Sequence, residues 1–223
     1  MTSSLEMIET IDAVTPLRFA ATVILIRDGT RGLEVLLLQR SSALEHMGGV
    51  WVFPGGKVEA TDQENAHDIL EASRHTAVRE TLEETGIKLI PKSLCPFAHW
   101  TTPEGVKKRF STWFFVARVN SVCEVLVDGS EITDYRWIEV ATHVPKLNSE
   151  SNKIRLTPPT FISLLELSSF SNSLSALEKL QTQPPNLFLP KMVSIEEGLC
   201  FLYQEDAAYN NLEINTIGNR HRT

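Results

Sequence analysis

The regular hydrophobic pattern of the chain begins at residue 19. Residues 20–26 form a short apolar run rich in β-branched side chains, and residues 33–39 form a second run after a turn at Asp28 and Gly29. Apolar runs of this length, bounded by turn residues, are typical of buried strands. We therefore predict that the two runs form a hairpin in the protein core.

Four more segments have the composition of strands. One is an aromatic segment flanked by glycines at residues 48–56, and the others lie at 87–90, 96–100 and 109–119, the last of which we expect to be central. Between the last two, residues 101–108 contain the proline and glycine of a loop. We expect this loop to contact the substrate and to influence specificity.

Helical spacing of apolar residues dominates the rest of the chain. It predicts helices near residues 140–146, 156–167, 173–181 and 194–203, with Pro184 and Pro185 between the last two. With 223 residues, of which 42% are hydrophobic, the chain is long enough for one sizeable core. We expect a flexible arm at residues 1–17, a domain at 18–148, and a helical extension at 149–223 that packs on the core.

Three carboxylates fall within little more than one turn of a further predicted helix. Glu80 precedes Glu83 by three residues and Glu84 by four, so the three side chains lean towards one patch. A hard divalent cation such as Mg²⁺ or Mn²⁺ would offset their repulsion, because such ions take oxygen ligands. The alternative is an ordinary solvated helix flank.

The same helix has recognisable ends and a predicted buried face. Gly86 is suited to a left-handed C-cap, and either Asp62 or Asp68 is suited to an N-cap. Val78 and Leu82 lie on one side and are expected to pack against the core.

The segment from Gly56 to Gly86 resembles the signature of the Nudix hydrolases. That signature is Gly, five residues, Glu, seven residues, then Arg-Glu-apolar-x-Glu-Glu-x-Gly-apolar. Residues 79–87 match its last part except that Thr81 occupies the first apolar position. The resemblance implies an α/β/α sandwich around a mixed sheet, with the acidic helix on one sheet face.

The first acidic position of the signature is ambiguous. Gly56 precedes Arg79 by 23 positions where the family pattern has 14, so nine residues are extra. Asp62 has the correct distance from Gly56, and Glu71 has the correct distance from Arg79. We favour Glu71, because it can share a continuous helix with the other acidic residues, and keep Asp62 as the alternative.

The resemblance also implies roles for individual residues. Glu80, Glu83, Glu84 and the backbone carbonyl of Gly56 would bind Mg²⁺ or Mn²⁺, and Arg79 would orient the carboxylates. Glu131, six residues before a tryptophan on a predicted strand, would be an additional metal ligand or a general base. The implied chemistry is hydrolysis of a nucleoside diphosphate linked to another group.

Basic and aromatic residues suggest where the substrate binds. Arg40 follows a predicted strand and is a candidate for contact with a phosphate, although a surface arginine closing a strand is the plainer interpretation. Lys107, Lys108 and Arg109 are the only basic triplet, and either meet substrate phosphate or form a solvated loop tip. His99 and Trp100 either face the nucleotide or belong to the core.

Several segments are similar to those of bacterial relatives of the peroxisomal coenzyme A diphosphatase branch. They are the insertion in the signature, residues 99–104 with Arg109 and Phe110, and residues 156–160. The resemblance implies coenzyme A or acyl-coenzyme A as substrate. The alternatives are ADP-ribose, dinucleotides, nucleoside triphosphates, or a nucleotide-sensing module that does not cleave its ligand.

Charge and cysteine content limit the remaining possibilities. A net charge of −7 without a basic stripe argues against binding to duplex nucleic acid. Three widely spaced cysteines suggest neither a disulfide framework nor a zinc site, so we expect a reducing cytoplasm. No secretory signal or membrane-length apolar segment is present, so we expect no membrane partner. Pairing into a homodimer is compatible with the family resemblance.

Overall fold

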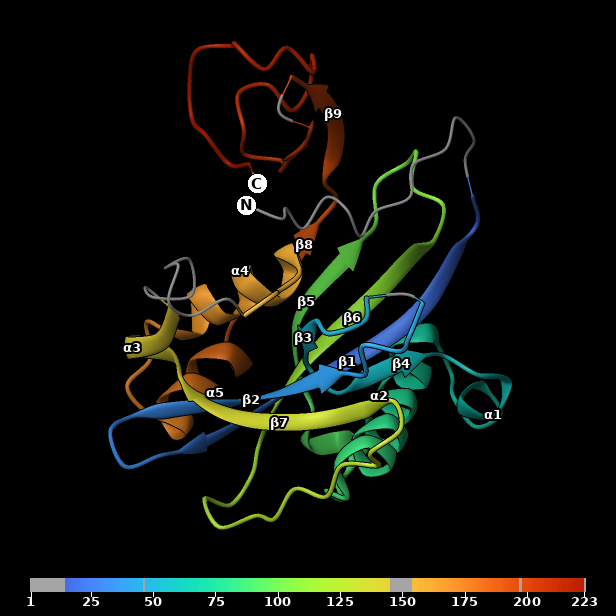
Figure 1. Ribbon diagram of the computed structural model, residues 1–223, viewed down its shortest axis with the longest axis vertical. Coiled ribbons are helices and arrows are strands. Elements are labelled where there is room, and N and C mark those ends of the chain that lie inside the picture. The colour runs from blue at the N-terminus through green and yellow to red at the C-terminus, as the bar shows by residue number, and fades with distance from the viewer. Residues whose placement is uncertain (1–14, 46, 145–153, 197, 223) are drawn as a thin grey trace.

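The computed structural model describes residues 15–45, 47–144, 154–196 and 198–222 (Figure 1). Within these residues the chain forms a large mixed sheet, helices on both of its faces, and a separate small hairpin. The elements in chain order are β1 Leu17–Asp28, β2 Leu33–Arg40, β3 Trp51–Val52, β4 Gly55–Lys57, α1 Ala60–Gln63, α2 Ile69–Thr85, a 3-10 turn Pro91–Ser93, β5 Cys95–Thr101, β6 Arg109–Arg118, β7 Ile132–Glu139, α3 Val140–His143, α4 Pro158–Leu167, α5 Ser173–Gln181, β8 Asn186–Phe188, β9 Lys191–Ile195 and β10 Gly198–Leu202.

The sheet is built around β1, the long apolar strand at the start of the chain. β1 pairs antiparallel with β2, which confirms the predicted hairpin, and parallel with β6. The strand order along the sheet is β3-β2-β1-β6-β5-β8, while β4 also pairs with β1 and β7 with β2. This pairing places β6 inside the sheet, as predicted, and brings the glycine turn of β4 against the middle of the core strand.

Helices cover the two faces of the sheet, which confirms the expected α/β/α sandwich (Figure 1). On one face, Ala77 of α2 packs with Val23 and Phe115. On the other face, Leu164 of α4 and Ala176 of α5 pack in a cluster that includes Phe114. The predicted helices at 156–167 and 173–181 are therefore confirmed, and they pack on the main core.

The side of α2 that faces the sheet is lined by small residues. It consists of Ala72, Ser73, Thr76, Ala77, Thr81 and Thr85. The hydroxyl groups of this side donate to carbonyls four residues earlier, so they are buried with their hydrogen bonds made. Thr81 thus fills the first apolar position of the signature. The expectation for Leu82 was wrong, because its side chain is 42% exposed.

Two predicted elements differ from the structure. Residues 87–90 form no strand, and the amide of Ile87 is bonded to the hydroxyl of Thr85. Residues 194–203 do not form a helix, because they contribute to the β9–β10 hairpin, in which Cys200 pairs with Val193. β-Branched residues in β9 and Gly198, whose φ of 134° favours glycine, fit this hairpin better than a helix.

Some expectations fall partly outside the described residues. Of the expected arm at residues 1–17, residues 1–14 lie outside them, and Leu17 already belongs to β1. The helix expected at 140–146 appears as α3, and Lys146 lies outside the described part. No helix in the described ranges is long and apolar enough to cross a membrane.

Candidate active site

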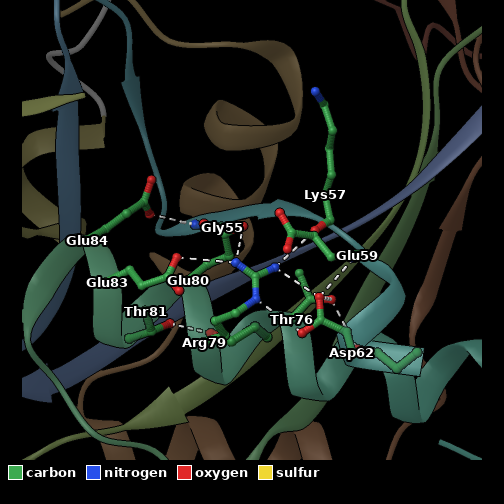
Figure 2. A network of polar contacts seen from close by, with 12 residues as sticks. Gly55, Lys57, Glu59, Asp62, Thr76, Arg79, Glu80, Thr81, Glu83 and Glu84 are labelled. Carbon is green, nitrogen blue, oxygen red and sulfur yellow. Dashed lines mark hydrogen bonds and ion pairs between the residues drawn. The ribbon is translucent and has the colours of Figure 1, made fainter. Parts of the chain in front are cut away.

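Arg79 is the centre of a polar network between α2 and the β4 turn (Figure 2). Its Nε and Nη2 donate to the two carboxylate oxygens of Asp62 at 3.1 and 2.9 Å. Its Nη1 donates to Glu80 at 2.9 Å and to Glu83 at 3.2 Å, and Nη2 also reaches the carbonyl of Lys57 at 3.2 Å. One guanidinium therefore ties two acidic residues of α2 to the preceding turn.

Asp62, rather than Glu71, is the acidic partner of Arg79. The side chain of Asp62 is only 5% exposed and also accepts from the hydroxyl of Thr76 and the amide of Glu59. Burial alone would raise the pKa of Asp62, but the hydrogen bonds from Arg79, Glu59 and Thr76 hold it below its ordinary value. The network therefore keeps this carboxylate charged.

Glu71 lies in the first turn of α2 and accepts from the amide of His67. It shares the helix with Arg79, as predicted, but eight residues of helix separate the two by about 12 Å. The nine extra residues therefore follow Asp62, where the chain leaves α1 and restarts at Asp68, the N-cap of α2. The preference for Glu71 over Asp62 is corrected by this geometry.

Glu84 occupies the other end of the acidic patch, and Figure 2 shows its carboxylate directed at the β4 turn. Its Oε2 accepts from the amide of Gly55 at 2.9 Å. Burial raises the pKa of Glu84 to about 8, against the opposing effect of the Gly55 amide, and the charge of Glu80 raises it further. Glu84 is thus a half-buried carboxyl group whose charged form is disfavoured by desolvation and by the neighbouring Glu80.

Two predicted site residues on other elements act on Glu84 through their charges. Arg40, at the end of β2, lowers its pKa, whereas Glu131 raises it. The amide of Ser41 donates to the carbonyl of Glu131 at 2.7 Å, which holds the two segments together. The Nε of Arg40 is buried without a hydrogen-bond partner among the described residues. A phosphate oxygen would supply that acceptor.

The β4 turn requires glycine at position 55, and at position 56 a larger residue would displace the side chain of Glu80. A Cβ at Gly56 would lie 2.1 Å from Oε1 of Glu80, and one at Gly55 would lie 2.3 Å from the carbonyl oxygen of Ala21. Gly55 also has a φ of 156°. These glycines let the backbone approach the acidic side chains closely, so backbone and carboxylate oxygens can share one ion.

The donor set fits a hard divalent cation. Glu80, Glu83 and Glu84 offer carboxylate oxygens, the ligand type that Mg²⁺ and Mn²⁺ prefer. In the described part of the chain, no three His, Cys, Asp or Glu side chains already converge on one point. Glu80 and Glu83 instead turn to Arg79, and Glu84 turns to Gly55. A cation would compete with these donors for the same oxygens.

A cavity of about 610 Å³ lies on the face of the sheet that α4 covers. Thr22 lines it, and its hydroxyl donates at 2.6 Å to the carbonyl of Pro54, the residue before the glycine turn. Phe53, Trp100 and Phe114 also line the cavity and belong to the cluster on the α4 and α5 face. The site therefore has an acidic part beside α2 and an aromatic hollow on the opposite face of the sheet.

The basic triplet of the 101–108 loop region does not act as a unit. Lys107 and Lys108 line the cavity. Arg109 is only 8% exposed and donates to the carbonyls of Thr102 and Thr15, so it fastens the loop rather than facing a substrate. The expectation that Arg109 joins the two lysines at a phosphate is corrected by this placement.

The two candidate aromatic-strand residues separate in the same way. Trp100 lines the cavity. His99 lies on the other face of β5, where its ring packs against Trp113 and its Nε2 is 2.8 Å from the hydroxyl of Ser111.

Sequence reasoning missed part of the cavity wall. Pro190, Phe201 and Tyr203 line it from the end of the chain, and Pro158 and Thr160 line it from the start of α4. The sequence pattern predicts a helix at residues 194–203, and no local signal connects these residues with Trp100. The β-branched residues of β9 and Gly198 are the sequence signal that could have indicated a β-hairpin here.

Comparison with known proteins agrees with this arrangement. A family model described as NUDIX domain matches residues 16–158. The putative nudix hydrolase 7 of Caenorhabditis elegans is 27% identical over 186 residues, which cover 68% of this chain and 60% of that protein. The acyl-coenzyme A diphosphatase NUDT19 of Xenopus laevis is 22% identical over an alignment of 280 residues, covering 82% of this chain and 73% of that protein.

Solved structures with the same fold include the NUDIX hydrolase from Alicyclobacillus acidocaldarius. It has a TM-score of 0.66 at 24% identity and covers 77% of this chain and all of that one. The NUDIX domain of Shewanella oneidensis NrtR, complexed with ADP ribose, has a TM-score of 0.51 at 17% identity, covering 74% and 90%. Because the family model matches more than half of the sequence, and the acidic helix, glycine turn and sandwich agree with it, the chain belongs to the Nudix domain family.

Proposed function

We propose that the protein is a metal-dependent hydrolase that cleaves a diphosphate linking a nucleoside to another group, with coenzyme A or acyl-coenzyme A as the preferred substrate. The observation that supports this proposal is the junction at Thr22, which lines a cavity with two lysines and donates to the carbonyl of Pro54, the residue before the glycine turn. A diphosphate at this junction has carboxylate-held metal on one side and room for its substituents on the other.

The acidic residues have the following roles in the proposal. Glu80, Glu83, Glu84 and the Gly56 carbonyl would hold Mg²⁺ or Mn²⁺. When bound, the metal neutralises the diphosphate and lowers the pKa of the attacking water. Arg79 orients Glu80 and Glu83, and Asp62 in turn fixes Arg79. Glu131 would be a further ligand or the base that takes the proton of the water.

In the proposed reaction, water attacks one phosphorus of the diphosphate, and the bond from that phosphorus to the bridging oxygen breaks. The products from coenzyme A are 3′,5′-ADP and 4′-phosphopantetheine. Arg40 is suited to stabilise the departing phosphate, because its buried Nε lacks a partner among the described residues.

Coenzyme A is preferred because it carries a third anion, the 3′-phosphate, at a distance from the diphosphate. Lys107 and Lys108 provide positive charge in the cavity. ADP-ribose has no such group, so it gains less from these lysines. The similarity to an acyl-coenzyme A diphosphatase across 82% of the chain points in the same direction.

A substrate panel with Mg²⁺ or Mn²⁺ tests the proposal. Coenzyme A, acetyl-coenzyme A, dephospho-coenzyme A, ADP-ribose, a dinucleotide and a nucleoside triphosphate are compared by kcat/KM, with products separated by chromatography. We expect coenzyme A or its thioester to be the best substrate. A much higher kcat/KM for ADP-ribose or a triphosphate would contradict the substrate, and binding without any cleavage would indicate a nucleotide-sensing module.

The lysines allow a sharper form of this test. Changing both Lys107 and Lys108 to glutamine is expected to raise KM at least tenfold for coenzyme A and less than threefold for dephospho-coenzyme A. The reason is that only coenzyme A loses an ionic partner for its 3′-phosphate. Lys88→Gln, an exposed lysine after α2, is the matched control. Equal losses for both substrates would show that the lysines do not contact the 3′-phosphate.

The proposal also includes a reducing cytoplasmic location and the possibility of a homodimer. All three cysteines are free thiols, with Cys95 and Cys200 buried, which supports a reducing compartment. Size-exclusion chromatography with light scattering measures the oligomeric state directly.

A further inference from the structure

We propose that the C-terminal cap, defined as residues 186–196 and 198–222, is the selectivity wall of the substrate cavity, and that Tyr203 is its decisive residue. The inference rests on the proposed function. It assigns the uncharged, chain-like part of the substrate, the pantetheine arm of coenzyme A, to the side of the cavity formed by the cap. All of the cap lies beyond the segment matched by the family model, which ends at residue 158.

The cap is attached directly to the floor of the cavity. β8 adds to the sheet as a parallel neighbour of β5, with Phe188 in register with Trp100. Their rings stack with centroids 3.9 Å apart and an angle of 12°. The ring of Tyr203 meets both edge-on, at 5.9 Å from Trp100 and 6.1 Å from Phe188. One ring from β5 and two rings from the cap therefore pack together at one corner of the cavity.

The backbone of Tyr203 is fixed within the cap. Its amide donates to the carbonyl of His221 at 2.9 Å, and its carbonyl accepts from the amide of Asp206 at 2.9 Å. Asp206 is itself held by Arg222, and its side chain has no exposed surface. Because both backbone groups of Tyr203 are bonded, its ring has a defined position in the wall.

The chemistry of the wall differs from that of the neighbouring loop. The cap contributes Pro190, Phe201 and Tyr203 to the lining, and none of these carries a charge. The charged side chains of the lining come instead from other segments: Lys107 and Lys108 from the loop, Arg155 from the segment before α4, and Glu45 from the segment after β2. An anionic group is therefore bound by the loop, and an uncharged group is bound by the cap.

A hydrogen-bond donor at the base of the wall is also unused. Trp100 is 5% exposed, lines the cavity, and its Nε1–H has no acceptor among the described residues. An unmade hydrogen bond in an apolar wall is costly. The pantetheine arm, unlike an alkyl chain, carries amide carbonyls that would supply an acceptor after a small movement of the ring. This favours an amide-containing arm over a purely hydrocarbon one.

The test measures binding of each half of coenzyme A without metal, so that no cleavage occurs. Isothermal titration calorimetry in EDTA gives Kd for 4′-phosphopantetheine and for 3′,5′-ADP with the full chain. We expect Tyr203→Ala to weaken 4′-phosphopantetheine at least tenfold and 3′,5′-ADP less than twofold. Tyr203→Phe, which keeps the ring, should stay within threefold of wild type for both ligands. Ile195→Ala removes apolar volume from the cap away from the cavity and is the matched control.

The outcomes separate this inference from the proposed function. Equal weakening of both ligands by Tyr203→Ala, no weakening, or no binding of 4′-phosphopantetheine to wild type would overturn the inference. If thermal melting shows that Tyr203→Ala is unfolded, the milder changes Pro190→Ala and Phe201→Leu must give the same ligand preference. If Tyr203→Ala selectively weakens 4′-phosphopantetheine binding but the wild-type protein does not cleave coenzyme A, the inference about the cap is supported and the proposed reaction is contradicted. If the protein cleaves coenzyme A but Tyr203→Ala does not selectively weaken 4′-phosphopantetheine binding, the proposed reaction is supported and the inference about the cap is contradicted.

Discussion

The two faces of the sheet are held together by different kinds of contact. On the α2 face, Arg79 and its acidic partners belong to residues 57–83 and are joined by charged hydrogen bonds. On the other face, Trp100 lies far in sequence from Phe188 and Tyr203, and the three are joined by ring packing. A charge-based site depends on each member, whereas a packed wall tolerates adjustment. Changes on the first face should therefore affect kcat, and changes on the second should affect KM.

The largest effect is expected on the acidic face. Glu84→Gln and Glu80→Gln keep the shape of the side chain but remove a charge that is proposed to bind the metal. Losing a metal contact costs several kcal/mol of transition-state stabilisation, which corresponds to roughly a hundredfold or more in kcat. Steady-state kinetics at saturating metal measures the loss, and thermal melting verifies the fold. Glu178→Gln, on the exposed side of α5, is the control, and near wild-type turnover in either site variant would contradict the assignment.

The next effect separates Asp62 from Glu71. Asp62→Asn should lower kcat/KM at least tenfold and the free energy of unfolding by about 1–3 kcal/mol, because a buried partner of Arg79 loses its charge. Glu71→Gln should change kcat/KM less than twofold, because this side chain only caps the start of α2. Chemical denaturation and kinetics on both variants provide the comparison. A greater loss for Glu71→Gln would restore the alignment that favours it.

A smaller effect is expected on the aromatic face. Phe188→Ala removes a ring pair of the kind worth about 0.5–1.5 kcal/mol, so KM for coenzyme A should rise roughly two- to tenfold. The value of kcat should stay within about twofold, since no contact of Arg79 changes. Leu187→Ala, the neighbouring residue with 59% exposure, should leave KM unchanged. A fall in kcat without a rise in KM would contradict the separation of the two faces.

The smallest effect tests the buried threonine of the signature. Thr81→Val keeps the volume and removes a hydroxyl that donates to the carbonyl of Ala77. We expect the free energy of unfolding to change by less than about 1 kcal/mol, because the carbonyl keeps its helical bond. Activity should remain at the wild-type level. Differential scanning calorimetry measures the change in the free energy of unfolding. A loss of activity similar to that of Glu80→Gln would show that Thr81 has a role beyond packing.

The acidic face was largely predictable because its information is local. Helical spacing places Glu80, Glu83 and Glu84 together, and Gly86 ends the helix in the left-handed conformation with φ 71°. The partner of Arg79 was not predictable in the same way. Asp62 and Glu71 each satisfy one distance along the chain, and only the restart of the helix at Asp68 decides between them.

The aromatic face was poorly predictable because its contacts are long-range. β8 pairs with β5 across almost ninety residues, and a strand of three residues is too short for its hydrophobic pattern to predict this pairing. The sequence predicts a helix where the β9–β10 hairpin lies, because the apolar residues at 199–202 fit both the helical and the strand period over so short a length. Arg109 was counted with its lysine neighbours, since alternation along a strand end is invisible without the sheet.

The ring stack of Trp100 on Phe188 also affects how the specificity of this protein can change. The residues proposed to hold the diphosphate and the cap proposed to contact its substituent come from separate stretches of sequence, connected by this ring stack, by the pairing of β5 with β8 and by the contact of Tyr203 with Trp100. A substitution at Tyr203 leaves every hydrogen bond of Arg79 in place. Sequence changes in the cap, by evolution or by design, can therefore alter which substituent of the diphosphate is accepted without changing the residues around Arg79.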